Sequence, residues 1–138
     1  MNMNHSEVHV SMTVPNSSAH LRLVRLVVAS LASDLGFGYD EVEDLRIVAD
    51  EIAHLVMEST LADRPVALDV VATGPELRVK VSGPAIESQS TPTLDPLASE
   101  IVGALVASHT VLRLDGRIEA SFQSRPPVQQ HSTSPDNG

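Results

Sequence analysis

Histidines and carboxylates are the side chains of this sequence that could ligate a metal ion, and their spacing does not favour a site. The six histidines are His5, His9, His20, His54, His109 and His131. No pair of them has the clear helical spacing of metal ligands, and the His-Glu-x-x-His pattern of zinc proteases is absent. The sequence also has no cysteine to supply a thiolate. We therefore expect no metal site.

Serines that could act as nucleophiles fall in one stretch rich in Ser, Thr and Pro, at Ser82, Ser88 and Ser90. A nucleophilic serine of the hydrolase type needs a Gly-x-Ser-x-Gly turn that exposes its hydroxyl, together with a partner base. Neither is visible here. The serines therefore predict no acyl-transfer chemistry.

Charged residues gather on residues 40–59, which have the pattern of a long helix. Asp40 and Glu43 predict a capping box at its start, and Arg46 with Asp50 has the i, i+4 spacing of a helical ion pair. The apolar residues recur every three or four positions, as one buried helix face requires: Val42, Leu45, Val48, Ala49, Ile52, Leu55 and Val56.

An earlier strand and helix precede that segment. Apolar and polar residues alternate over residues 7–14, which predicts a half-buried strand. Helical spacing follows over residues 19–35, and Gly36 ends the helix because glycine accepts a left-handed backbone. Arg22 and Arg25 lie on a flank of this helix.

Two hairpins follow in the second half of the chain. Residues 66–72 and 76–81 predict strands joined by a tight turn, and residues 110–114 and 117–122 predict a second pair. Asp115-Gly116 joins the second pair and is a strong hairpin signal.

A third helix is predicted between the hairpins, after a loop over residues 82–94. Asp95 caps it and Pro96 occupies its first position, where a missing N–H costs nothing; it runs to about Ser108. Gly103 inside it is expected to serve packing. The element order predicts an α+β two-layer sandwich with helices on one face of a mixed sheet. We expect one domain over residues 7–124, with a flexible N-terminus (1–6) and a disordered tail (125–138).

The stretch Val42–Ile52, VEDLRIVADEI, carries the most specific resemblance to a known family. Together with Leu21–Arg25 (LRLVR) and the element order, it resembles the anti-sigma serine kinase family of the GHKL ATPases, which have the Bergerat, or histidine-kinase-like, fold. The resemblance covers about residues 7–124 and is closest to the short actinobacterial anti-sigma-F factors. It implies a degenerate histidine-kinase-like ATPase domain.

The nucleotide-binding parts of that family are largely missing. By the resemblance, Glu51 matches the glutamate that serves the attacking hydroxyl, but Leu55 stands where an asparagine binds magnesium and offers no oxygen ligand. Residues 81–83 supply no carboxylate for the adenine-binding Asp-x-Gly-x-Gly turn, and Pro84 removes a backbone donor. The loop over residues 87–95 has no glycine to cradle phosphates. We expect no cofactor, and ATP with magnesium is disfavoured.

Composition limits the partners. The chain has 138 residues, a formal net charge of −9 and 42% hydrophobic residues, which suits one folded core. Its acidity disfavours direct nucleic-acid binding, and suits a basic protein partner unless it serves only solubility. No apolar run reaches the ~18 residues of a membrane span. The absence of cysteine fits a cytoplasmic protein.

The resemblance therefore implies an anti-sigma factor for a stress-type or sporulation-type sigma factor, relieved by an anti-anti-sigma protein of the STAS type. It implies a pseudokinase in transcription regulation and the stress response, and a homodimer. Arg22 and Arg25 are the candidate partner-binding residues, the alternative being a solvated helix flank. Glu51 is a remnant base or a structural residue. Two other functions stay open: an active serine/threonine kinase that phosphorylates its antagonist with ATP, and an interaction domain unrelated to transcription.

Overall fold

The structure is a computed structural model that describes residues 7–87 and 89–128. Its elements follow in the predicted order: β1 (Val8–Val14), the short 3-10 helix η1 (Ser18–His20), α1 (Leu21–Asp34), α2 (Tyr39–Ser59), β2 (Val66–Thr73), β3 (Glu76–Pro84), α3 (Pro96–Leu105), β4 (Ser108–Leu114) and β5 (Arg117–Gln123). The third helix is shorter than predicted because Ser108 already begins β4.

The five strands form one sheet in the order β1-β2-β3-β5-β4, and every neighbouring pair is antiparallel. The predicted α+β two-layer class is confirmed, but the expectation of a mixed sheet was wrong in its detail. β3 and β4 run in the same direction, because each is antiparallel to β5. The second hairpin inserts β5 between them, so two parallel strands never become neighbours.

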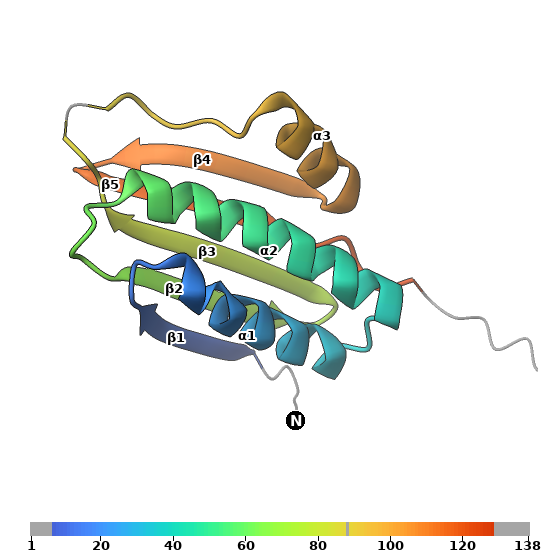
Figure 1. Ribbon diagram of the computed structural model, residues 1–138. Helices are drawn as coiled ribbons and strands as arrows, with labels where there is room; N and C mark the ends of the chain where they lie inside the picture. The colour runs from blue at the N-terminus through green and yellow to red at the C-terminus, as the bar shows by residue number, and fades with distance from the viewer. Residues whose placement is uncertain (1–6, 88, 129–138) are drawn as a thin grey trace, which may run out of the picture.

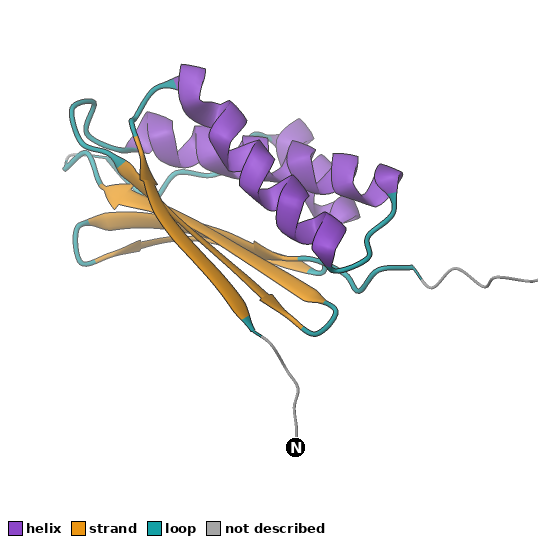
Figure 2. Ribbon diagram, turned by 90° about the horizontal axis from the view of Figure 1, so that it is seen from below, coloured by secondary structure: helices purple, strands orange, loops and turns teal. Residues whose placement is uncertain are grey.

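The helices form one layer on one face of the sheet, and the other face is uncovered (Figures 1 and 2). The core lies between the layers, where Leu68 and Val79 of the sheet meet Ile52 of α2 and Val28 of α1. All four side chains are at most 1% exposed, so the central strands and α2 supply much of the apolar burial that stabilises the fold.

The connection between α1 and α2 depends on two glycines. Gly36 has φ +90°, as a glycine that ends a helix often has. Gly38 is the N-cap of α2, and its backbone N–H donates to the Glu41 carboxylate at 2.8 Å. The predicted capping box of Asp40 and Glu43 was therefore wrong by two positions in each residue, because the helix begins earlier, at Tyr39.

The hairpin turns are those predicted. Asp115 and Gly116 have φ of 52° and 76°, the left-handed pair that a two-residue hairpin turn requires. β3, however, continues beyond the predicted end at Val81 through Pro84, where Gly83 pairs with Ile118.

The predicted flexible ends fall mostly outside the described residues, at 1–6 and 129–138. Of the tail, residues 125–128 are described, and the Val128 N–H donates to the second oxygen of Glu41 at 2.9 Å. Within the described ranges, no helix has the length and apolar character that crossing a membrane would require.

Candidate functional site

The face of α2 that looks toward α3 holds the residues that the sequence singled out for catalysis. Asp44 lies beside Ala104 and Leu105 of α3 around a small hollow. Glu51 and Leu55 come two and three helical turns after Asp44, at about 3.6 residues per turn, and so share its side of the helix. The structure therefore places Glu51 and Leu55 on one face of α2, as their spacing predicts.

The Glu51 side chain is half-buried and lies on α2 one turn before Leu55. Over residues 7–87 and 89–128, no hydrogen bond or ion pair involves this side chain. Neighbouring His54 pairs with Glu58 at 3.2 Å, on a more exposed side of the helix. Among the described residues, Glu51 therefore has no arginine partner of the kind that a structural ion pair would give it. It also has no second oxygen ligand one turn later, because the half-buried Leu55 side chain is a hydrocarbon.

Gly83, at the end of β3, serves close packing against the segment after α2. A Cβ built on it would lie 2.4 Å from Thr60 Oγ1 and 2.8 Å from Thr60 Cγ2. The two segments are also joined by backbone hydrogen bonds, from Leu61 N to Pro84 O at 3.0 Å and from Ile86 N to Ser59 O at 3.1 Å. The chain therefore continues as strand β3 through the residues where the resemblance implied an adenine-binding turn.

The loop after β3 is fastened to the sheet by one arginine. The Arg113 guanidinium on β4 donates to three backbone carbonyls, those of Ile86 (3.2 Å), Glu87 (3.1 Å) and Gln89 (2.8 Å). A guanidinium offers several donors in a fixed planar fork, which suits it to hold a loop in this way. The Arg113 guanidinium therefore binds backbone carbonyls of the loop.

The same region is acidic. No lysine or arginine occurs in the sequence between Lys80 and Arg113, whereas Glu87, Asp95 and Glu100 do. The carboxylates of Asp44 and Glu51 on α2 face the same side. A phosphate group would meet like charge here.

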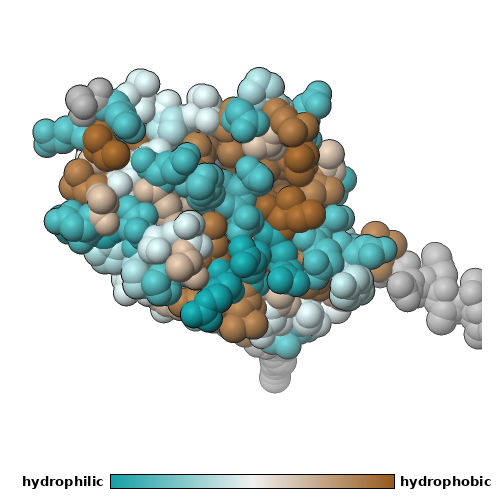
Figure 3. Space-filling model, in the orientation of Figure 1, coloured by the Kyte–Doolittle hydropathy of each residue, from teal (hydrophilic) through white to brown (hydrophobic). Residues whose placement is uncertain are grey.

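A hollow of about 350 Å³ on the outer surface of α1 and α2 is lined by arginines. Its lining residues are Arg22, Leu23, Arg25, Leu26, Ala29 and Arg46. Leu26 is 66% exposed. In Figure 3 the deepest teal gathers over the border between α1 and α2, where these arginines lie.

Two of these arginines are neutralised by neighbours. Arg25 pairs with Asp50 at 2.5 Å, linking α1 to α2, and Arg46 pairs with Glu43 at 2.8 Å. The predicted pair of Arg46 with Asp50 was wrong, because Arg25 from the other helix takes Asp50. In the described part of the chain Arg22 makes no ion pair and is exposed, so it is the cation of this hollow that a partner could engage.

No family model matches the chain. Among curated proteins, the serine-protein kinase RsbW of Halalkalibacterium halodurans is 37% identical over 54 residues, which are 39% of this chain and 33% of that protein. RsbW of Bacillus subtilis (strain 168) is 35% identical over 49 residues, which are 36% of this chain and 31% of that protein. The matched stretch thus spans about a third of the length of these relatives.

The crystal structure of the RsbU and RsbW domains of Rv1364c from Mycobacterium tuberculosis superposes with a TM-score of 0.65 at 16% identity, covering 86% of this chain and 32% of that one. The chain has an RsbW-type fold. The resemblance to the anti-sigma serine kinase family is confirmed in fold and in a local stretch of sequence. The short actinobacterial anti-sigma-F type stays a prediction.

The donor set of this RsbW-type fold does not fit magnesium–ATP. Magnesium demands oxygen ligands, and the position one turn after Glu51 offers only the Leu55 side chain. The space beside Gly83 is filled by Thr60, and the Ser82 hydroxyl accepts a hydrogen bond from the Arg117 guanidinium at 3.1 Å. The loop without glycine is held in place by Arg113. Among the described residues, no group of three or more His, Cys, Asp or Glu side chains could hold a metal ion.

Sequence reasoning missed Arg113 and misjudged Gly103. Nothing in the local sequence marks Arg113 as a loop anchor, because its three acceptors are backbone carbonyls 24 to 27 residues away. Gly103 was expected to serve packing, but a Cβ built on it meets nothing within 4 Å. Its surroundings are open because this side of α3 faces solvent.

Proposed function

We propose that this chain is a cytoplasmic anti-sigma factor that sequesters an alternative sigma factor, of the stress or sporulation type, by protein–protein binding. A STAS-type anti-anti-sigma protein competes for it and releases the sigma factor. The mechanism is mass action between two partners and needs no chemical step. The chain acts as a homodimer, and its kinase-like domain is a pseudokinase that binds neither ATP nor magnesium.

The RsbW-type fold and the local similarity to RsbW kinases support this proposal. The main observation behind it is that the positions expected to bind a nucleotide hold side chains that serve packing instead. Leu55 is hydrocarbon where a metal ligand is needed, and Gly83 is packed against Thr60. Phosphoryl transfer depends on positioning and on charge stabilisation by metal ions, so a fold without these parts is suited to recognition.

The arginine-lined hollow between α1 and α2 is our candidate surface for the sigma factor. The unpaired Arg22 offers a cation to a carboxylate of the partner, and the exposed Leu26 offers apolar contact beside it. Arg25 contributes mainly by holding α1 against α2 through Asp50. Arginine is one of the residues enriched among those that contribute most to binding at protein interfaces.

One observation favours the alternative of an active serine kinase: the matched relatives are named serine-protein kinases. Calorimetry with magnesium–ATP separates the two. We expect no heat of binding at millimolar nucleotide, and a saturable signal would overturn the pseudokinase proposal.

The partners are tested by affinity purification of the tagged chain from its host, followed by mass spectrometry. We expect a sigma factor and a STAS-domain protein. Recovery of neither would refute the proposal and favour an interaction domain unrelated to transcription.

The surface is tested by charge reversal. Arg22→Glu should weaken binding of the recovered sigma factor by about tenfold or more. Arg64→Glu makes the same change of charge on an exposed turn outside the hollow, and should leave binding within about twofold. Equal effects of the two variants would move the sigma-binding surface elsewhere.

A further inference from the structure

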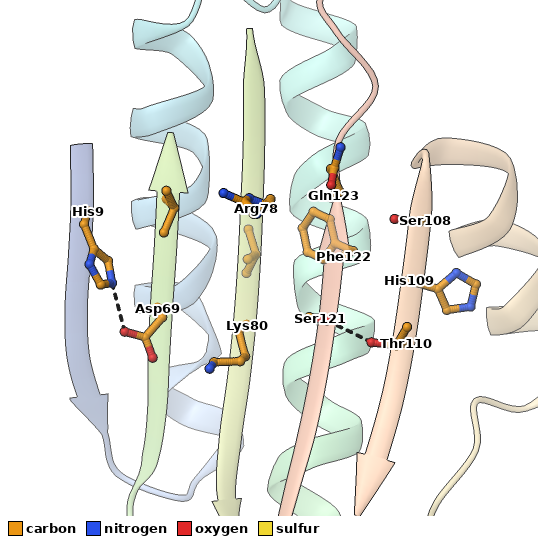
Figure 4. A pocket seen from close by; sticks show the side chains of 12 residues that line it. His9, Asp69, Arg78, Lys80, Ser108, His109, Thr110, Ser121, Phe122 and Gln123 are labelled. Atoms are coloured by element: carbon orange, nitrogen blue, oxygen red, sulfur yellow. Dashed lines mark hydrogen bonds and ion pairs between the residues drawn. The ribbon is translucent and has the colours of Figure 1, made fainter. Parts of the chain in front are cut away.

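The uncovered face of the sheet holds a hollow of about 470 Å³ (Figure 4). All five strands contribute to it, and its lining residues are His9, Asp69, Val71, Arg78, Val79, Lys80, Ser108, His109, Thr110, Ser121, Phe122 and Gln123. It lies on the opposite side of the sheet from the helices and from the arginine hollow of α1 and α2.

Two cations stand at the centre of this hollow. Arg78 and Lys80 alternate with the buried Leu77, Val79 and Val81 on β3, so both side chains point out of the same face. Both are exposed. Over residues 7–87 and 89–128, neither forms a hydrogen bond or an ion pair. Most other arginines are engaged, as Arg25, Arg46, Arg113 and Arg117 are.

Asp69, the carboxylate that lines the hollow, already has partners within the protein. Asp69 accepts from the Ser11 hydroxyl and lies 3.2 Å from His9 Nε2, both on the neighbouring edge strand β1. The Ser11 hydrogen bond, with smaller contributions from His9 and Lys80, holds the pKa of Asp69 below its ordinary value. Asp69 therefore stays ionised but turned toward β1. The lining residues carry an excess of one positive charge, in a chain of net charge −9.

The side chains that line the opposite wall carry no formal charge, and the Glu76 carboxylate lies beside them. Thr110 and Ser121 face each other across β4 and β5 with their hydroxyl oxygens 2.9 Å apart, and Gln123 donates to Glu76 at 3.0 Å. Hydroxyl groups can turn to donate to an incoming oxygen. The hollow thus combines two unpaired cations with adaptable hydrogen-bond donors.

We propose that this hollow docks an extended acidic segment of a partner protein, with carboxylates at every second residue. Residues two apart on a strand are about 6.7 Å apart along it. An extended partner segment has the same repeat, so two alternate carboxylates would match Arg78 and Lys80.

The charge distribution favours this partner over a second copy of the chain. A second sheet packed face to face about a twofold axis through the hollow would bring its own Arg78 and Lys80 toward these cations, and like charges would meet. An acidic segment instead finds here a local excess of positive charge on a protein that otherwise repels it. This surface is separate from that of the proposed function and does not depend on it.

Two synthetic hexapeptides of identical composition test the proposal. One alternates Glu and Thr, and the other has three Glu followed by three Thr. Each is titrated into the ¹⁵N-labelled full chain at low salt, because exposed charges are screened beyond about 10 Å at 0.1 M. We expect the alternating peptide to bind several-fold more tightly, with amide shifts on β3 and β5.

Charge-reversal variants supply the control. Arg78→Glu with Lys80→Glu should weaken binding of the alternating peptide by about tenfold or more. Arg64→Glu with Arg125→Glu makes the same change of net charge outside the hollow and should leave affinity within about twofold. Equal affinity of the two peptides would overturn the proposal, as would shifts confined to the helical face. Sedimentation showing a dimer that the Arg78→Glu, Lys80→Glu variant dissociates would assign the face to a second copy instead.

Discussion

Replacing Gly83 by alanine would put a methyl group into a space that Thr60 already fills. The new Cβ would lie 2.4 Å from Thr60 Oγ1 and 2.8 Å from Thr60 Cγ2. Thr60 is 2% exposed, and its hydroxyl donates to the Val56 carbonyl at 2.7 Å. It cannot rotate away without losing that hydrogen bond, and the pairing of Thr60 with Ala85 keeps the two backbones together.

The cost follows from two contributions. Overpacking a well-filled site costs about 1–3 kcal/mol, and a displaced buried hydroxyl forfeits a hydrogen bond that contributes about 1 kcal/mol. Gly83→Ala should therefore lower the free energy of unfolding by about 2–4 kcal/mol. A glycine kept for contact with a nucleotide would show no such penalty in the free protein.

Urea unfolding followed by circular dichroism measures this change, and two further variants sharpen it. Gly103→Ala has open space around the new Cβ and should stabilise α3 by about 0.5–1 kcal/mol. In the double variant with Thr60→Ala, both clashing atoms are gone. Its destabilisation should be at least about 1 kcal/mol smaller than the sum of the two single effects.

An unchanged unfolding midpoint for Gly83→Ala would refute the packing argument. Strict additivity with Thr60→Ala would refute its assignment to Thr60. Equal losses for the alanine variants at positions 83 and 103 would show that backbone freedom, and not close approach, is what these glycines provide.

Three further changes test other contacts. Because the Ser11 hydrogen bond lowers the pKa of Asp69, ionised Asp69 stabilises the fold above its unfolded pKa, and this contribution is lost as the pH falls through the lower folded value. Asp69→Asn should therefore reduce the melting temperature at pH 7 and make the melting temperature fall less steeply as the pH is lowered. Parallel plots of melting temperature against pH for the two proteins would count against this. Arg113→Lys should speed proteolysis of the loop around residues 86–89, since an ammonium cannot reproduce the fork on its carbonyls; unchanged cleavage would mean that the loop is held by other contacts. Glu41→Ala should cost about 1 kcal/mol through the lost cap at Gly38, measured by urea unfolding, whereas Glu100→Ala on exposed α3 should be nearly neutral.

Local sequence patterns predicted most of the fold because alternation and helical periodicity survive in the tertiary structure. Two local signals misled. Gly83 and Pro84 resemble strand breakers, yet they extend β3. Their pairing with β5 and the hydrogen bonds to the segment after α2 hold the backbone extended there. Asp40 resembles an N-cap, but Gly38 takes that position and leaves no side-chain signal.

The candidate sites were predictable only where they lie on one element. Glu51 and Leu55 share a helix face by spacing alone. The partner of Arg25 could not be predicted from the sequence, because Asp50 lies 25 residues away. Arg46 is nearer to Asp50 in the sequence and was therefore the predicted partner of that carboxylate. The basic hollow on the sheet was missed altogether, because it depends on the register that aligns Lys80 with Ser121 and with Asp69.

The position of β5 has a consequence for how the protein is made. This strand leaves the ribosome after all the other described strands, yet it occupies an interior place between β3 and β4. Until Arg117–Gln123 has emerged, a nascent chain has β3 with one bare edge and nothing to cover it, and an unpaired edge recruits other chains. A truncation that removes β5 itself, from Arg117 onward, should therefore produce aggregates rather than a smaller folded protein.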